Sequence, residues 1–237
     1  MQRYFAKLEN GNIVFTEDDI FHISRVMRMK VNDEIEVVID DELYLVKIDS
    51  FTPFSTSIVK KIDEKHELNG NIRLFICLLK GDKTEFVIQK AVELGVKDIV
   101  LVESKRSIIH IEENKKESKL IRFNKVVKEA LEQSKRTYSF KINDIISFKD
   151  IKNYKADISL IPYENCKDNL SLLKEDFKDL KNKTVNVIVG PEGGFSIEEV
   201  EYAKTNGFKE ITLGKRILRA ETASIFIVSL LSFFMEE

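Results

Sequence analysis

A buried strand that runs into a glycine-rich turn, and from there into a helix, constrains the fold of this chain most. The apolar run 185–189 ends at Gly190-Pro191-Glu192-Gly193-Gly194, and Ser196 and Glu199 have the spacing of a capping box that begins a helix. Ligands of open α/β sheets bind at the edge where such strands end, and glycines allow close contact with the backbone there. We interpret the turn as a ligand-binding loop of an enzyme. The alternative is a connector whose glycines have only steric duties.

Apolar runs and helical segments alternate through the C-terminal two thirds of the chain. Runs typical of strands covered on both faces occur at 72–79, 99–102, 158–161, 185–189 and 211–213. A helix is predicted at 84–94, and another at about 116–135. This alternation predicts an α/β domain with a mainly parallel sheet.

The first 70 residues have a different pattern, with short strands predicted at 3–8, 12–15, 34–40, 43–49 and 56–62. Asn10-Gly11 marks a hairpin, and the apolar residues Ile20, Ile23, Val26 and Met27 predict one helix over 18–29. We expect a small β-barrel with a single helix packed on it. The polar stretch 63–71 places the domain boundary, so the predicted domains are residues 1–70 and 71–237.

Composition excludes several classes of protein. With 38 Lys and Arg against 40 Asp and Glu, the chain has no global basic character, so a nucleic acid must be held by a local patch. Cys77 and Cys166 are far apart, and the three histidines are isolated, which predicts neither disulfides nor a metal site. The longest apolar stretch, 225–235, is shorter than the roughly 20 residues of a membrane span. We expect a soluble, cytoplasmic protein.

A second glycine turn, Leu213-Gly214, follows the last strand and leads into a helix that is apolar nearly all round. Such a helix is buried, either within its domain or in a dimer interface. Arg219 and Glu221 lie at its start, where they either pair with each other or form a site in which the carboxylate orients a guanidinium toward RNA. In the helix near 116–135, Glu129, Gln133 and Arg136 share one face, as a polar cluster or as an ordinary solvated surface.

Taken together, these segments resemble the bacterial 16S ribosomal RNA uracil-N3 methyltransferases, the RsmE family of the SPOUT superfamily, over essentially the whole chain. The segments that carry the resemblance are Arg3-Tyr4-Phe5, residues 22–28, Lys80-Gly81-Asp82-Lys83, residues 89–96, 104–107 and 129–136, the run 188–195, and the run 213–223. The combination of the last two runs is specific to this family.

The resemblance implies an N-terminal PUA-like RNA-binding barrel and a C-terminal SPOUT domain whose chain forms a deep trefoil knot. It implies a homodimer that uses S-adenosylmethionine to methylate N3 of a specific uridine in the 16S ribosomal RNA of the small subunit. Two alternatives stay open. One is another SPOUT enzyme acting on transfer RNA or on a ribose 2′-hydroxyl, and the other is a non-catalytic RNA-binding factor of ribosome assembly.

The resemblance also implies site residues. Cofactor contacts are expected from three loops, at Leu160, Ile161 and Pro162, at Gly190, Pro191, Glu192, Gly193 and Gly194, and at Leu213, Gly214, Ile217, Leu218 and Ala223. Either Arg219 or Arg136 is expected to stabilise the charge that develops on the uracil, with Glu221 as a candidate base. RNA contacts are expected at Arg3, His22, Arg25, Arg28, Lys80, Lys83, Lys90, Arg106 and Gln133.

Overall fold

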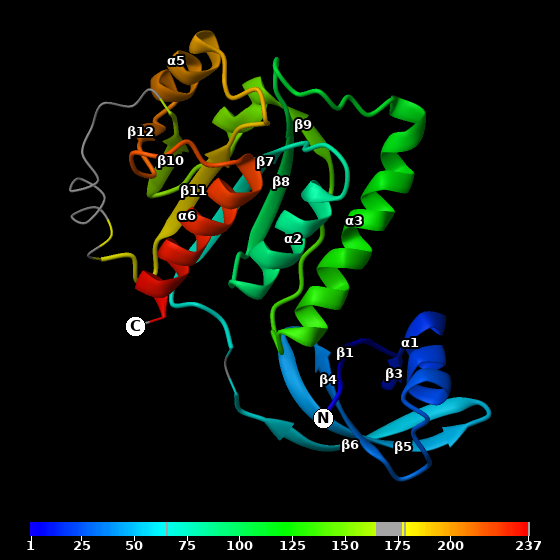
Figure 1. The fold of residues 1–237 in the computed structure, drawn as a ribbon. Coiled ribbons are helices and arrows are strands. Elements are labelled where there is room, and N and C mark those ends of the chain that lie inside the picture. The colour runs from blue at the N-terminus through cyan, green and yellow to red at the C-terminus, as the bar shows by residue number, and fades with distance from the viewer. Residues whose placement is uncertain (65, 165–176, 178, 237) are drawn as a thin grey trace. The chain divides into compact units, whose positions relative to one another are not determined.

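The computed structural model describes residues 1–64, 66–164, 177 and 179–236, which form two compact units (Figure 1). The first unit combines Met1–Glu67 with Leu131–Ser139, and the second combines Leu68–Ala130 with Phe140–Glu237. The helix α3, Glu113–Gln133, therefore begins in the second unit and ends in the first. Cys77 is buried and free, and Cys166 lies outside the described residues.

Four strands of the first unit form one sheet in the order β1-β4-β5-β6, and two more form a separate hairpin. β1 runs parallel to β4, and the other neighbours in the sheet are antiparallel. The hairpin of β2 and β3 turns at Asn10 and Gly11, which have the positive φ angles of 49° and 79° that its sequence predicts. The strands are β1 (Arg3–Phe5), β2 (Lys7–Glu9), β3 (Asn12–Val14), β4 (Glu34–Ile39), β5 (Glu42–Phe51) and β6 (Phe54–Ile62).

The segment predicted as one helix over 18–29 divides into two kinds of helix. α1, Glu17–Phe21, begins at a capping box formed by Thr16 and Asp19, and a π-helix, His22–Val26, follows it. The wider winding of a π-helix changes which side chains reach the core. Ile23 is fully buried, but Val26 and Met27 are 57% and 45% exposed. The prediction that these last two residues face inward was wrong, because it assumed regular α-helical spacing.

The second unit is built on a six-stranded sheet in the order β12-β10-β11-β7-β8-β9. Every neighbouring pair of strands is parallel, which confirms the predicted α/β domain. β9 was missed because three residues without a long apolar run give little signal. The strands are β7 (Asn71–Cys77), β8 (Asp98–Glu103), β9 (Ile145–Ser147), β10 (Ile158–Pro162), β11 (Thr184–Val189) and β12 (Lys209–Ile211).

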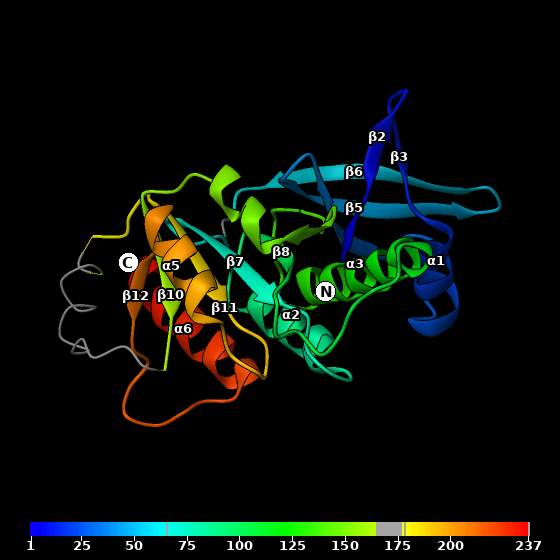
Figure 2. The same ribbon diagram turned by 90° about the horizontal axis from the view of Figure 1, so that it is seen from above.

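Helices cover both faces of this sheet (Figure 2). α2 (Lys83–Glu93) and α6 (Ala220–Met235) pack against each other, and α6 also packs on β7 and β11. On the opposite face, α5 (Ile197–Thr205) and the 3₁₀ helix Phe148–Asn153 contribute to a buried cluster with alternate residues of the strands. No described helix is long and apolar enough to cross a membrane.

The capping box predicted at the start of α5 is present. The Ser196 hydroxyl accepts a hydrogen bond from the Glu199 amide at 3.2 Å, and the Glu199 carboxylate accepts one from the Ser196 amide at 2.9 Å. The same carboxylate accepts a bond from the Lys105 amide at 2.8 Å, which joins the loop after β8 to this helix. Glu199 is only 5% exposed, so its bonds hold the turn between β11 and α5 in one conformation.

Candidate functional site

A cavity of about 440 Å³ opens in the second unit, where β10, β11 and β12 end. Three loops line it, at 162–164, at 189–195 and at 212–219, together with Lys83 of α2 and the first turn of α6. The strands β10, β11 and β12 are parallel neighbours, so the loops that follow them meet at one edge of the sheet. The parallel topology therefore brings together segments that are about 50 residues apart in the sequence.

Most of the residues expected to contact a cofactor line this cavity. Those that line it are Pro162, Gly190, Pro191, Glu192, Gly194, Leu213, Gly214, Ile217, Leu218 and Ala223. Leu160 and Ile161 do not, because both are fully buried within β10. Gly193 is also absent from the lining, and it faces Arg106 instead. Sequence reasoning missed Tyr163 and Thr212, which lie next to predicted positions in the same two loops.

Glycine is required for different physical reasons at the three positions of the turn after β11. A Cβ atom on Gly190 would lie 3.1 Å from the ring of Phe195, and one on Gly193 would lie 3.1 Å from the backbone oxygen of Arg106. Gly194 instead has a φ of +66°, a conformation that other residues rarely adopt. The steric explanation therefore holds for Gly190 and Gly193, since the protein's own atoms occupy the space there.

Charged groups from three segments meet at the rim of the cavity. The Lys83 ammonium lies 3.2 Å from the Glu221 carboxylate and 3.9 Å from that of Glu192. Glu192 also accepts a hydrogen bond from the backbone amide of Lys80 at 3.0 Å. Glu221 thus pairs with Lys83. Among the described residues, Glu221 does not form the direct ion pair with Arg219 that was one of the two expectations from the sequence.

Glu221 is largely buried, with 15% of its side chain exposed. Burial by itself would raise the pKa of Glu221, but the backbone hydrogen bond at the start of α6 and the charges of Lys83 and Arg219 hold it below its usual range. One carboxylate oxygen, Oε2, is buried and has no hydrogen-bond partner among the described residues. The group is therefore ionised at neutral pH beside the cavity.

Arg219 is the N-cap residue of α6, and its exposed side chain lines the cavity. Arg136, the other arginine expected to act in catalysis, belongs to the first unit and is 2% exposed. Its guanidinium binds the carboxylate of Glu67, with Nη2 to Oε2 at 2.5 Å. Glu67 also accepts bonds from the amides of Thr137 and Tyr138, each at 3.1 Å.

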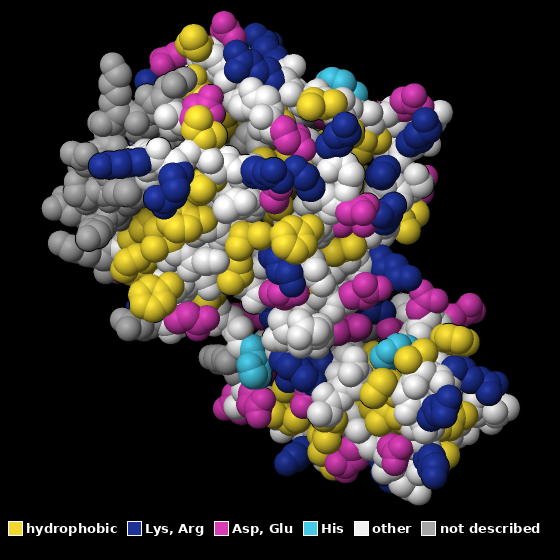
Figure 3. Space-filling model, in the orientation of Figure 1, with side chains coloured by type: hydrophobic (Ala, Val, Ile, Leu, Met, Phe, Trp, Pro, Cys, Tyr) yellow, Lys and Arg dark blue, Asp and Glu magenta, His cyan; other side chains and the backbone are white. Residues whose placement is uncertain are grey.

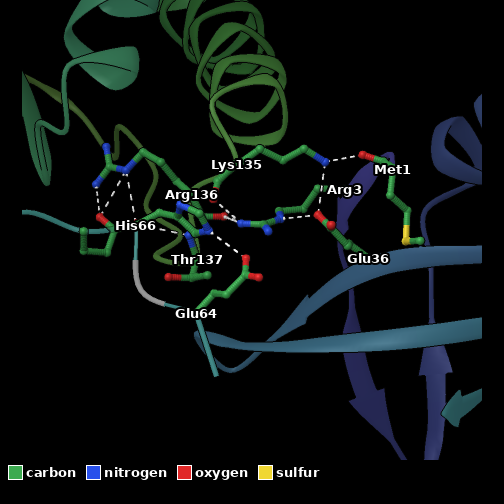
Figure 4. A network of polar contacts seen from close by, with 9 residues as sticks. Met1, Arg3, Glu36, Glu64, His66, Lys135, Arg136 and Thr137 are labelled. Carbon is green, nitrogen blue, oxygen red and sulfur yellow. Dashed lines mark hydrogen bonds and ion pairs between the residues drawn. The ribbon is translucent and has the colours of Figure 1, made fainter. Parts of the chain in front are cut away.

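Arg3, expected to contact RNA, is also buried, with 1% of its side chain exposed. Its Nε donates to the Glu36 carboxylate at 2.9 Å, and Lys135 binds the same carboxylate at 3.0 Å. Arg3 further donates to the backbone oxygens of Lys135 and Arg136. Figure 4 shows Arg3, Glu36 and Lys135 pointing toward one another. These bonds hold the end of α3 to β1 and β4 within the first unit.

The other residues expected to contact RNA differ in whether their side chains already bind another group of the protein. Lys90 pairs with Glu93 at 2.9 Å, Arg106 donates to the backbone oxygen of Gly193 at 3.3 Å, and the ring of His22 is 2.9 Å from the Tyr4 hydroxyl. The residues of this group that are exposed are Arg25, Arg28, Lys80, Arg106 and Gln133. Within the described part of the chain, no group of three or more potential metal ligands is present.

Comparison with known proteins identifies the family. Residues 66–232 match a family described as an RNA methyltransferase domain, and residues 15–50 match one described as an RNA methyltransferase PUA domain. The ribosomal RNA small subunit methyltransferase E of Mesomycoplasma hyopneumoniae is 36% identical, over 97% of this chain and 98% of that protein. The protein of the same name from Bacillus subtilis is 31% identical, over 100% of this chain and 98% of its own length.

A solved structure supports the same relationship. The ribosomal RNA small subunit methyltransferase E of Neisseria gonorrhoeae, crystallised with S-adenosyl methionine, superposes with a TM-score of 0.84 at 27% identity. The match covers 98% of this chain and 96% of that one. With an RNA methyltransferase domain over more than half its length and relatives above 30% identity over nearly all of it, the chain belongs to the RNA methyltransferase family that includes the ribosomal RNA small subunit methyltransferases E.

Proposed function

We propose that this protein transfers a methyl group from S-adenosylmethionine to N3 of a specific uridine in the 16S ribosomal RNA of the small subunit. The observation that carries the proposal is the cavity where β10, β11 and β12 end, in a chain of the RNA methyltransferase family. The relatives named above are small-subunit methyltransferases, and one of them was crystallised with the methyl donor. The N3 position follows from the resemblance of the sequence segments. Because the proposed substrate is ribosomal RNA, we also propose a cytoplasmic location.

The residues of the cavity fit the proposed cofactor. Its volume of about 440 Å³ lies within the range of small-molecule sites. Apolar side chains, among them Leu213 and Leu218, suit the flat face of an adenine, and Gly190 and Gly194 line the cavity without a side chain that would fill it. The charges at the rim suit the ammonium and carboxylate groups of an amino acid. S-Adenosylmethionine, when bound, supplies a methyl group on a positively charged sulfur, ready for in-line displacement.

The protein must position the uracil and respond to the loss of its N3 proton. We assign charge stabilisation to Arg219, because it lines the cavity and extends from the N-terminus of α6, where the helix dipole adds positive potential. Its guanidinium donates hydrogen bonds to the uracil carbonyl oxygens, where negative charge develops as the proton leaves. Arg136 is less suited to this role, since Glu67 already binds it.

Glu221 is the proposed acceptor of the N3 proton, as the ionised carboxylate beside Arg219. Its lowered pKa makes it a weak base, so proton removal has to be coupled to methyl transfer, with Arg219 stabilising the remaining charge. A weak base is sufficient for this step when a fixed cation stabilises the uracil, because the imide anion does not have to accumulate before the methyl group is transferred.

The wider organisation belongs to the same proposal. We assign RNA binding to residues 1–70 and catalysis to residues 71–237, with the chain of the second domain forming a deep trefoil knot. We also propose a homodimer. α6 has buried residues on one side, but Phe226, Phe233 and Phe234 are 44%, 68% and 37% exposed, and hydrophobic side chains gather over this helix in Figure 3. A second copy that covers these aromatic side chains removes a large apolar surface from water.

Mass spectrometry of ribosomal RNA nucleosides tests the activity. Small subunits from a strain lacking this gene should gain one N3-methyluridine when incubated with the purified protein and S-adenosylmethionine. A methyl group at a ribose, or on transfer RNA, would contradict the proposal in favour of another RNA methyltransferase. Absence of S-adenosylmethionine binding in calorimetry would favour a non-catalytic RNA-binding protein.

A further inference from the structure

The loop between β12 and α6 has a concentration of positive charge that no carboxylate among the described residues pairs with. Lys215, Arg216 and Arg219 lie within five positions, line the cavity and have exposed side chains. Among the residues that the structure describes, no ion pair is formed by Lys215 or Arg216. Between them and Arg219, Ile217 is 82% exposed, so the loop projects into solvent instead of packing on the domain.

Three other cations of the second unit that were expected to contact RNA are occupied by acceptors of the protein itself. Lys83 binds two carboxylates, Lys90 binds Glu93, and Arg106 binds a backbone oxygen of the glycine turn. A cation that is already paired has to give up its partner to bind a phosphate, which offsets much of the gain. In the described part of the chain, Lys215 and Arg216 have no such partner to lose.

The balance of charge around the cavity indicates the kind of ligand. The lining holds Lys83, Lys215, Arg216 and Arg219, against Glu164 and Glu192. Because Lys83 lies between Glu192 and Glu221, its charge is already compensated. The uncompensated positive charge is therefore on the loop, and the N-terminus of α6 directly after it adds to the potential. A polyanion that approaches the cavity over this loop meets complementary charge.

We propose that Lys215 and Arg216 bind backbone phosphates of the RNA strand that presents its target base to the cavity. This inference rests on the proposed function and adds two RNA-binding residues to it. Contacts with phosphates position a strand without reading its sequence, so the loop holds the strand while the cavity accepts one base. An arginine beside a lysine suits this task, since the guanidinium can bind two phosphate oxygens at once.

The test compares the double variant Lys215→Ala/Arg216→Ala with a matched control, Lys152→Ala/Lys155→Ala. The control removes the same charge from exposed residues of the same unit that do not line the cavity. Binding of a fluorescent uridine dodecamer is followed by anisotropy over a series of KCl concentrations. S-Adenosylmethionine affinity is measured by calorimetry, and methylation is measured on unmodified small subunits.

The loop variant should bind the RNA at least about tenfold more weakly, with a salt slope reduced by about 0.7 for each phosphate that the loop no longer neutralises. Its affinity for S-adenosylmethionine should be unchanged, and KM for small subunits should rise more than kcat falls. Equal weakening in the control variant, or an unchanged salt slope, would overturn the inference. So would a loss confined to S-adenosylmethionine binding, because the two cations would then serve the cofactor's carboxylate. Failure of the unmodified protein to methylate would instead refute the proposed function.

Discussion

The ammonium group of Lys83 lies 3.2 Å from the carboxylate of Glu221, so the start of α2 is held to the first turn of α6 at the rim of the cavity. Lys83 also lies 3.9 Å from Glu192, in the turn after β11. A residue expected from the sequence to contact RNA thus connects two segments that line the cavity. Lys83 consequently has a role in shaping the site that is independent of RNA.

Replacing Lys83 with Met should weaken S-adenosylmethionine binding by about two- to fivefold. The change leaves Glu192 and Glu221 without their shared cation and frees the start of α6, although a partly exposed pair contributes only about 0.2–1 kcal/mol. Calorimetry on Lys83→Met, Glu221→Gln and the double variant should give losses that do not add. Lys204→Met is the matched control, since Lys204 lies within 4 Å of Glu201 and Glu210 outside the cavity. Additive losses would contradict a direct coupling of Lys83 with Glu221.

Replacing Arg219 with Ala should leave S-adenosylmethionine binding nearly intact and lower kcat by about 100-fold or more, as expected when one donor to a developing oxyanion is removed. The measurement is single-turnover methylation of unmodified small subunits, with cofactor affinity determined in parallel. Arg219→Lys should recover part of the rate, because it restores the charge without the paired donors. An unchanged kcat in Arg219→Ala would exclude the proposed role.

Gly194→Ala should weaken cofactor binding and also lower stability. A residue that carries a Cβ atom destabilises the folded state by about 1–2 kcal/mol when it adopts the φ of +66° found there. Gly207→Ala is the matched control, because Gly207 has a φ of +88° with no atom near its Cβ position and does not line the cavity. Both variants should unfold at lower urea concentrations, and only Gly194→Ala should raise the Kd for S-adenosylmethionine. An equal effect of the two on Kd would argue against a cofactor contact at this glycine.

The pair Arg136 and Glu67 should make the first unit sensitive to acid. Burial by itself would raise the pKa of Glu67, but Arg136 and the amides of Tyr138 and Thr137 lower it below its usual range. A carboxylate with a lowered pKa in the folded state contributes stability at neutral pH, and this is lost as the pH falls below about 4.3. The protection factors of the Thr137 and Tyr138 amides, taken relative to the intrinsic exchange rate at each pH, should therefore fall in acid.

Glu67→Gln should lower the protection factors of these two amides already at neutral pH, because Arg136 then stays buried without a counter-charge, a loss of about 3 kcal/mol. Exposed Glu9, changed to Gln, provides the control. If the protection factors in Glu67→Gln still fell in acid as they do in the unmodified protein, the effect would belong to another group.

The exposed aromatic side chains of α6 should determine the oligomeric state. Phe233→Ser should shift the protein from dimer to monomer in sedimentation velocity, since Phe233 is 68% exposed in the single chain. Ile121→Ser is the control, because Ile121 is equally exposed, at 66%, but lies on α3. A monomeric unmodified protein, or a dimer that persists in Phe233→Ser, would contradict an interface on this helix.

The local pattern of the chain determined its elements and its fold class. Strands covered on both faces appear as continuous apolar runs, and a capping box requires only two residues three positions apart, so β11, the turn at Gly190 and the start of α5 were all predictable. Two of the three loops of the cavity were predictable for the same reason, since each has a glycine within three positions of the end of a strand.

Only the tertiary structure decided which charged side chains are free to bind a ligand. The sequence predicts functional roles for Arg3 and Arg136. Within the first unit, however, residues 131–139 fold together with residues 1–67, which buries both arginines and pairs them with Glu36 and Glu67. Lys215 and Arg216, to which the sequence pattern assigns no role, stay exposed at the cavity. The carboxylates that bind Arg3 and Arg136 lie 33 and 69 positions away in the chain, and local periodicity contains no information at that range.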